Sequence, residues 1–257
     1  MEKTFAPFQA TTTGMKMLYW SGTMGFLYAA WAAYHRHNLI IPLPGEVWTA
    51  FQRMLHEDLI EQLWRSFSLN VQALFWSTLI SCGLAYLYVL PVFRPFVTLV
   101  CKMRFLGFSG ITTLFAMATE GRTFQIALLT FGMSAFYVTS MVDVVRAIPP
   151  EEINHARSVH LGPLGIIWHV AIRGTLHQML DVMRQTSAMG WVMLAFAEGL
   201  VLSQGGVGVM LINLGRRWDL AAIFAVQISI MLVGMAWDFV QALLREIACQ
   251  GFPQKEE

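Results

Sequence analysis

Residues 148–179 read IPPEEINHARSVHLGPLGIIWHVAIRGTLHQM and form a polar stretch between two long apolar ones. Pro149 and Pro150 are followed at once by Glu151 and Glu152. Proline is tolerated in the first turn of a helix, and acidic side chains there favour the positive end of the helix dipole. Apolar or small residues then recur at helical spacing, and Gly162-Pro163 is a common stop pair. The stretch therefore predicts a short helix, a stop, and a second short helix from about Leu164.

Composition places the whole chain among membrane proteins. Of its 257 residues, 56% are hydrophobic and only 13% are charged, and the mean hydropathy is +0.54. Soluble domains carry about 25% charged residues. A net charge of +1 gives no sign of nucleic-acid binding. The cysteines at 82, 101 and 249 are too scattered for a metal-binding motif or a disulfide framework.

Six apolar runs are long enough to be predicted as membrane-spanning helices. They are residues 17–34, 66–93, 105–119, 123–142, 185–202 and 220–244. The third run is short and contains Gly107 and Gly110, and residues 96–101 extend it in an alternative assignment. The predicted fold class is thus an all-α, polytopic membrane protein with about six spans. The polar stretch at 148–179 then connects spans 4 and 5.

The remaining segments are predicted to lie at or outside the membrane surface. Residues 1–15 and 247–257 are polar tails that flank a transmembrane domain at 16–246. After a Pro- and Gly-containing turn, one helical face collects apolar side chains at Val47, Phe51, Met54 and Leu55, which predicts an amphipathic helix at the interface. Residues 203–219 are predicted to be a glycine-rich loop.

The distribution of basic residues predicts the orientation. If the termini are inside, eleven of the 17 Lys and Arg residues lie on the inner side, namely Lys3, Lys16, Arg94, Lys102, Arg104, Arg146, Arg157, Arg173, Arg184, Arg245 and Lys255. Six lie outside, namely Arg36, Arg53, Arg65, Arg122, Arg216 and Arg217. The positive-inside rule therefore places both termini and residues 148–179 in the cytoplasm.

From about Leu39 to Glu246 the chain resembles the membrane-spanning permease subunit of a binding-protein-dependent ABC importer, in the nitrate/sulfonate/taurine branch. Such permeases have prolines before an amphipathic helix, as Leu43–Val47 have here. Their cytoplasmic loop carries a Glu-Ala-Ala motif, and residues 154–159 fall on that pattern. Ala197-Glu198 and then residues 203–208 resemble the run that follows the fifth span of the family.

The chain departs from the family motif at several positions. Asn154 replaces the glutamate of the motif, His155 replaces its first alanine, and His160 stands at its glycine. Only Ala156 and Arg157 keep the core of the motif. Arg173 and His177 stand where the family usually has prolines.

The resemblance implies a subunit of a bacterial cytoplasmic (inner) membrane importer that works with other chains. In the family, the loop forms coupling helices that sit in a groove of the ATPase subunit. The implied coupling residues are Glu151, Glu152, Asn154, His155, Ala156, Arg157, His160 and Gly162. Of these, Ala156 is predicted to face the groove, with Arg157 beside it. The implied partners are ABC ATPase subunits, a second permease subunit of the same or a different chain, and an extracytoplasmic solute-binding protein. The implied solute is a small anion such as nitrate, a sulfonate or taurine.

The residues themselves are consistent with a non-catalytic role, without cofactor or metal sites, as the resemblance to a transport subunit implies. A phosphate-binding loop needs a glycine followed by lysine, and none of the four lysines follows a glycine. ATP and Mg²⁺ are therefore expected on the partner ATPase. The alternative is a membrane-bound metalloenzyme that uses histidines of this stretch, which are His155, His160, His169 and His177. Their spacings of five, nine and eight do not match the spacing of ligands on one helix.

Two carboxylates lie within predicted spans. Charged groups are expensive inside a bilayer and often functional. For Glu198, a structural hydrogen-bonding role is weighed against contact with solute, and the former is favoured roughly two to one. Asp238 is near the inner end of its span, so a solvated or ion-paired position is expected. Gly205, Gly206 and Gly208 fit either a plain loop or a hinge at the outer mouth.

Overall fold

A computed structural model describes residues 42–106 and 108–249, together with eight helical residues between positions 19 and 30. Four long helices are α3 (Leu59–Leu87), α6 (Gly121–Arg146), α9 (Leu176–Gly199) and α11 (Leu220–Cys249). Six shorter ones are α2 (Pro44–His56), α4 (Arg94–Lys102), α5 (Phe108–Ala118), α7 (Pro150–Ser158), α8 (Pro163–Ile166) and α10 (Val207–Arg216). Short turns η2 (Met103–Phe105) and η4 (Leu202–Gln204) and the π-helix η3 (Ile167–Arg173) complete these elements. No strand occurs in this part of the chain, which confirms the all-α class.

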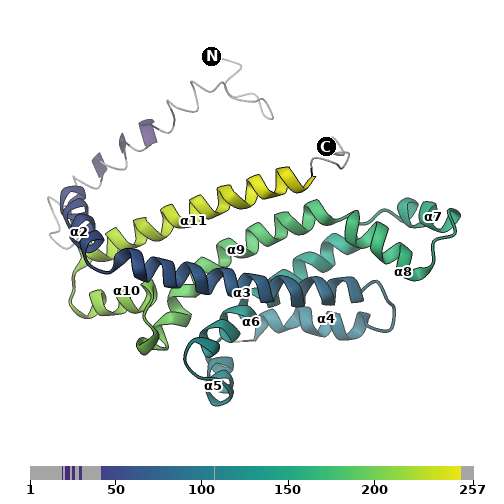
Figure 1. The fold of residues 1–257 in the computed structure, drawn as a ribbon, viewed down its shortest axis with the longest axis horizontal. Helices are drawn as coiled ribbons and strands as arrows, with labels where there is room; N and C mark the ends of the chain where they lie inside the picture. Colours follow the sequence, from purple (N-terminus) through teal and green to yellow (C-terminus); the bar gives the residue numbers. More distant parts are fainter. Residues whose placement is uncertain are drawn as a thin grey trace.

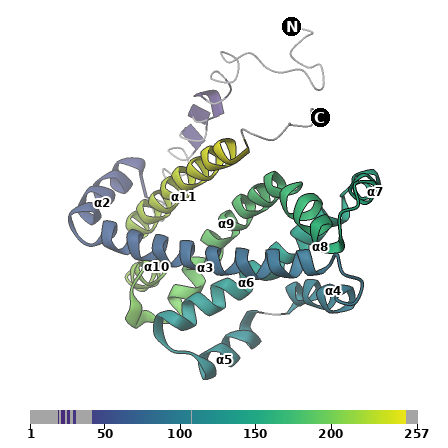
Figure 2. The same ribbon diagram turned by 45° about the vertical axis from the view of Figure 1, so that its right-hand side comes forward.

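The long helices lie side by side and define two ends of a bundle (Figure 1). One end, called the α10 end, gathers α2, α10 and the beginnings of α3 and α11. There the Arg53 guanidinium binds the Asp219 carboxylate at 2.7 Å, and the Gly206 amide donates to the Gln62 side chain at 2.6 Å. The opposite end, called the α7 end, carries α7 and α8 (Figure 2). There the Arg146 guanidinium donates to the Tyr88 hydroxyl at 3.0 Å.

The chain passes between these two ends five times within the described residues. α3 and α6 both run from the α10 end to the α7 end, since Arg122 donates to Ser68 near their beginnings and Arg146 contacts Tyr88 near their ends. The connection from Tyr88 to Glu120 must therefore return across the bundle, and it does so through α4, η2 and α5 (Figure 2). α9 then runs to the α10 end and α11 runs back.

Three of these helices are long and apolar enough to cross a membrane: α3, α6 and residues 220–248 of α11. The pair made by residues 94–105 and 110–118 meets the same test together but is bent by 108°, so the number of candidate spans is three, or four with the bent pair. This falls short of the six that the sequence predicted. The predicted first span, 17–34, lies largely outside the described residues.

The predicted fifth span lies in α9, which does not meet the test for a candidate span. Charges interrupt it at Arg184 and Glu198, and Gln185, Thr186 and Ser187 are polar. α9 packs against α3, α6, α10 and α11, so much of its surface meets protein. A helix covered by neighbouring helices does not need the apolar surface that lipid demands.

Formal charges bracket the apolar segments at matched levels. α6 carries none between Arg122 and Asp143, and α11 carries none between Asp219 and Asp238. These 20 and 18 residues measure about 30 and 27 Å at helical rise, close to the hydrocarbon thickness of a bilayer. Of the basic residues predicted inside, Arg146, Arg157 and Arg173 lie at the α7 end. Of those predicted outside, Arg53, Arg65 and Arg216 lie at the α10 end.

Two predicted boundaries need correction. α3 begins at Leu59 rather than Ser66, because Arg65 pairs with Glu61 at 2.6 Å one turn away and so both charges are accommodated in the first turns of the helix. The predicted loop at 203–219 contains the helix α10. The predicted break at Pro91 and Pro95 is confirmed, since α3 ends at Leu87 and α4 starts with Pro95 in its first turn.

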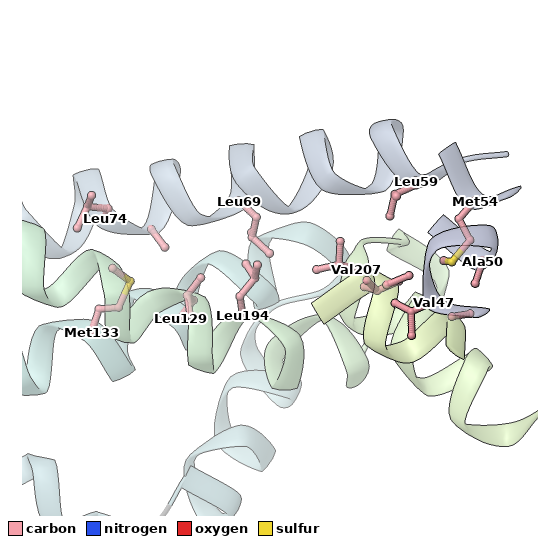
Figure 3. Close-up of a cluster of buried hydrophobic side chains, with 14 residues drawn as sticks. Val47, Ala50, Met54, Leu59, Leu69, Leu74, Leu129, Met133, Leu194 and Val207 are labelled. Atoms are coloured by element: carbon pink, nitrogen blue, oxygen red, sulfur yellow. The ribbon is translucent and has the colours of Figure 1, made fainter. Parts of the chain in front are cut away.

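The main core runs along α3, α6 and α9 and continues under α2 (Figure 3). Leu69, Leu129 and Leu194 meet in its centre, and Val47 and Met54 close it at the α10 end. The predicted amphipathic helix is confirmed as α2, but Leu55 of the predicted apolar face is exposed, and a place at the membrane interface stays a prediction. Its buried face is Val47, Ala50 and Met54, and it packs against α11, so protein rather than lipid covers it.

Candidate docking element and charged junctions

The element that follows α6 at the α7 end contains the residues predicted to dock a partner. Pro149 is extended, with φ −61° and ψ 137°, and α7 begins at Pro150. Glu151 and Glu152 lie in its first turn and His155 and Arg157 in its last. Acidic side chains at the start and basic ones at the end both favour the helix dipole. The local sequence therefore specifies the predicted short helix.

The helix ends through hydrogen bonds that place a non-glycine residue in the left-handed region. His160 has φ 58°, its amide donates to the Arg157 carbonyl at 2.9 Å, and the Leu161 amide donates to the Ala156 carbonyl at 3.2 Å. This is the paired bonding of a Schellman motif, in which glycine usually takes the left-handed position. Gly162 of the predicted stop pair does not have a positive φ; among described residues with positive φ, His160 is the one at this turn.

The second short helix is confirmed, and it changes type. α8 starts at Pro163 and passes at Ile167 into the π-helix η3. At its end, the Thr175 hydroxyl donates to the Ala171 carbonyl at 2.5 Å, and a side chain at Gly174 would overlap the Val170 carbonyl. π-helical turns are rare and often occur at functional sites.

A groove of about 620 Å³ separates α7 from η3. Glu151, Glu152, His155, Ala156 and Val159 line it from α7 and its end, and Leu161, His169, Val170 and Gly174 line the other side. Two carboxylates and two imidazoles thus surround an apolar floor. Such a lining suits a cationic or hydrogen-bonding side chain with an apolar stem.

The predicted coupling residues differ in how they meet the surface. Most are exposed, namely Glu151, Asn154, His155, Arg157, His160 and Gly162, and Glu152 is half-buried. Ala156 is 5% exposed, and its side chain faces inwards over the groove. A partner would therefore reach Ala156 only by entering the groove, whereas Asn154 and Arg157 lie on the open surface. That Ala156 contacts a partner stays a prediction.

Glu198 lies in a buried junction at the α10 end and is 1% exposed. The Ser66 hydroxyl donates to one carboxylate oxygen at 2.5 Å, and the Gly208 amide donates to the other at 2.7 Å. The Val207 amide donates to Ser66 in turn at 2.9 Å. The carboxylate thus binds the N-terminus of α10, where helix dipole and free amides favour an anion. This arrangement favours the structural role over contact with solute.

Glycines let the chain approach this carboxylate closely. Gly206 has φ +107°, and a side chain there would overlap the Glu198 carboxyl group. A side chain at Gly208 would overlap the backbone of Ala195. The glycine-rich segment is therefore a tightly packed junction between α9 and α10, held from α3 by Ser66 and Gln62.

Asp238 is ion-paired, which is one of the two positions that the sequence predicted for it. Its carboxylate binds both Nε and one terminal nitrogen of Arg184, which is a bidentate contact between α9 and α11. Nearer the ends of the two helices, Arg245 binds Asp181 at 3.0 Å. The Trp237 and Gln241 side chains each donate to Ser187 at 3.0 Å, on the same seam.

Two buried amides were not singled out by the sequence. Asn70 of α3 is 1% exposed and Gln125 of α6 is 3% exposed. In the described structure, both side-chain polar atoms of Asn70 and the Nε2 atom of Gln125 lack a hydrogen-bond partner. Ser66, Asn70, Ser77 and Ser81 recur at spacings of four, seven and four along α3. That spacing was the available signal for a polar face inside an apolar helix.

The histidines predicted for the alternative metalloenzyme divide into two groups. His155 and His169 line the α7–η3 groove, whereas His160 and His177 do not. Within the described residues no group of three His, Cys, Asp or Glu side chains is arranged to hold a metal ion.

Comparison with known proteins identifies no family for this chain, so a functional assignment depends on the residues described above. The chain matches no protein-family model, and no curated protein matches it.

Proposed function

We propose that this chain is the membrane-spanning permease subunit of a binding-protein-dependent ABC importer, with α7 as the helix that docks on a separate ATPase subunit. The observation that carries the proposal is the short helix that starts with paired prolines and projects at one end of the long helices (Figures 1 and 2). Its polar residues from Glu151 to Arg157 are exposed or half-buried and include charges of both signs. Such a surface suits a polar protein–protein contact.

The resemblance over Leu39 to Glu246 supports the same assignment. The proposed topology has six spans: residues 17–34, then the five passes made by α3, the bent α4–α5 connection, α6, α9 and α11. Charges at the two ends of the apolar segments support a bilayer at this level. The termini and α7 are then cytoplasmic, in the inner membrane of a bacterium, by the excess of Lys and Arg at the α7 end.

The proposed subunit carries solute without its own ATPase site. ATP and Mg²⁺ bind the partner ATPase, a second permease subunit completes the pathway, and an extracytoplasmic binding protein delivers the solute at the α10 end. The proposed solute is a small anion such as nitrate, a sulfonate or taurine. The buried hydrogen bonds of Glu198 hold the α10 end in one geometry, which supports a rigid surface for delivery of the solute. The groove between α7 and η3 supports a contact whose geometry changes when the ATPase changes.

A docking experiment tests the proposal. The tagged full-length chain is purified from its native membrane in mild detergent, and co-purified proteins are identified by mass spectrometry. An ABC ATPase is expected in near-equal amount with the wild type. Arg157→Glu reverses an exposed charge on α7, and like charges brought together at an interface cost several kcal/mol. We expect at least a tenfold loss of the ATPase with this variant.

The matched control is Arg216→Glu, which reverses an exposed arginine of α10 at the opposite end. It should retain the ATPase. Absence of any ABC ATPase from the wild-type preparation contradicts the proposed function. An ATPase that stays with Arg157→Glu contradicts α7 as the docking helix and leaves the class of protein standing.

A labelling experiment tests the orientation. Cysteine is placed at His56 of α2 or at Arg157 of α7 in a variant that lacks Cys82, Cys101 and Cys249. Both positions are exposed and lie at opposite ends of the bundle. An impermeant thiol reagent should label position 56 in intact cells and position 157 only after lysis. Labelling of position 157 from outside reverses the proposed orientation.

A further inference from the structure

An apolar groove of about 490 Å³ opens beside α6, and neither Glu198 nor the Arg184–Asp238 pair lines it. Trp76 and Ile80 of α3 form one wall, Met103 of η2 and Phe115 of α5 form the other, and Ala127 and Thr130 of α6 form the floor. The groove exists because the chain bends by 108° between residues 94–105 and 110–118, so α5 does not follow α6 along its whole length (Figure 2).

The groove follows the apolar segment of α6 that is proposed to cross the membrane. Its floor extends along α6 from Thr123 to Val138, which is about 22 Å at helical rise, within the segment of α6 that carries no formal charge. One leaflet of a bilayer occupies about half of the 30 Å hydrocarbon core. The groove is therefore long enough to take the acyl chain of a lipid from one leaflet.

Basic residues lie beside the groove on the side formed by α4 and η2. Between positions 62 and 119 the chain has no Asp or Glu, whereas Arg94, Lys102 and Arg104 lie in or beside α4. Lys102 and Arg104 are exposed and directly flank Met103, which lines the groove. Phe96 and Leu99 are exposed, so α4 also presents apolar surface next to these basic residues.

We infer that this groove is a binding site for an anionic glycerophospholipid. One acyl chain occupies the groove, and Lys102 and Arg104 contact the phosphate-bearing head group at its end. Basic pockets between membrane helices bind anionic head groups in this way, and each basic residue near the surface adds to the attraction. The inference needs a membrane-embedded chain, and it does not depend on the proposed transport function.

The hydroxyl groups on the floor are compatible with an acyl chain. Thr130 and Ser134 have no hydrogen-bond partner in the described structure. A helical Ser or Thr can turn its hydroxyl to the carbonyl four residues earlier, as Thr139 does with Ala135 at 3.1 Å. Contact with lipid therefore does not require these hydroxyls to give up a partner.

Trp76 provides a direct test, because it lines the groove and is 49% exposed. The purified full-length chain is placed in vesicles that contain phosphatidylglycerol or phosphatidylcholine brominated on the acyl chains, and quenching by each lipid is measured. Subtraction of the Trp76→Phe variant isolates the Trp76 signal. We expect Trp76 to prefer brominated phosphatidylglycerol by about fivefold for each engaged basic residue.

Two variants and one control make the test specific. Lys102→Glu with Arg104→Glu should reduce the preference to about one, whereas Arg216→Glu with Arg217→Glu at the α10 end should leave it unchanged. Ala127→Phe should fill the groove and lower quenching of Trp76 by both lipids, and circular dichroism checks that each variant keeps its helices. A wild-type preference near one, or a preference that survives the Lys102 and Arg104 changes, overturns the inference. Protection of Trp76 from both lipids in a particle of two chains overturns it in favour of a second copy.

Discussion

The two ends of the bundle satisfy their polar groups in different ways. At the α10 end, Glu198 binds α10 and Ser66 of α3, while Gln62 binds the adjacent turn, so three helices share one buried network. At the α7 end, a groove separates α7 from η3, and the charged side chains of α7 either line this groove or lie on the open surface. Buried hydrogen bonds hold their side chains in one geometry. Exposed polar side chains remain available to bind another molecule. The difference indicates a fixed end and a contact end.

Removing the central group of the fixed end should have the largest effect. Glu198→Ala deletes two hydrogen bonds to a carboxylate and leaves the Gly208 amide without its partner. Bonds to charged groups contribute about 1.5–3 kcal/mol each, so we expect a loss of about 3–6 kcal/mol. Thermal unfolding in detergent, followed by intrinsic fluorescence, measures it as a fall in Tm of roughly 6 °C or more.

The control for this prediction is Glu151→Ala, in the first turn of α7, where the carboxylate is exposed. Its Tm should stay within about 2 °C, because surface substitutions usually change stability by less than about 0.5 kcal/mol. Equal effects of the two substitutions would remove the distinction between a fixed end and a contact end.

The ion pair between α9 and α11 should have an intermediate effect. Arg184 and Asp238 are bidentate, but their side chains are 39% and 45% exposed, so the pair is worth about 1 kcal/mol. Asp238→Asn should lower Tm by about 2–4 °C. The swapped variant Arg184→Asp with Asp238→Arg should recover part of this loss. If the swap is worse than the sum of both single changes, the pair does not contribute through its charges.

The most local effect is expected at the contact end, and it has the opposite sign. His160 holds a left-handed conformation that costs a non-glycine residue about 1–2 kcal/mol. His160→Gly should therefore strengthen the end of α7, and hydrogen exchange of the α7 amides should slow by roughly fivefold. Gly162→Ala is the matched control, since Gly162 has no positive φ and a methyl group added there would meet no atom within 4 Å. Faster exchange in His160→Gly would contradict the left-handed cap.

Local signals in the sequence predicted several elements correctly. The prolines and acidic residues at 149–152 specify α7 within its own turn, and Pro91 and Pro95 end α3 without help from distant residues. Apolar spacing predicted α2, because its buried face is a property of one helix. Such signals act over a few residues, so a single amino-acid sequence is enough to interpret them.

Other features depend on residues far apart in the chain. Arg184 and Asp238 are 54 positions apart, and Glu198 meets Ser66 across 132, so their pairing follows only from the packing of helices. Glycines around α10 argued for a loop, whereas close packing against Ala195 and Glu198 requires them in and next to a helix. The left-handed residue is His160 rather than Gly162 because hydrogen bonds at the helix end, rather than residue type, select it.

The π-helix η3 connects α8, at the contact end, to α9. The number of residues in such a connection determines how the helix before it is rotated relative to the helix after it. A helix that gains or loses one residue turns everything beyond that point by about 100° around its axis. The number of residues in 167–173, rather than their identity, therefore sets the rotation of α8 relative to α9. Deleting one of them would turn α8 relative to α9. Under the proposed docking role of α7, length variation here would change the surface that the α7 end offers to a partner.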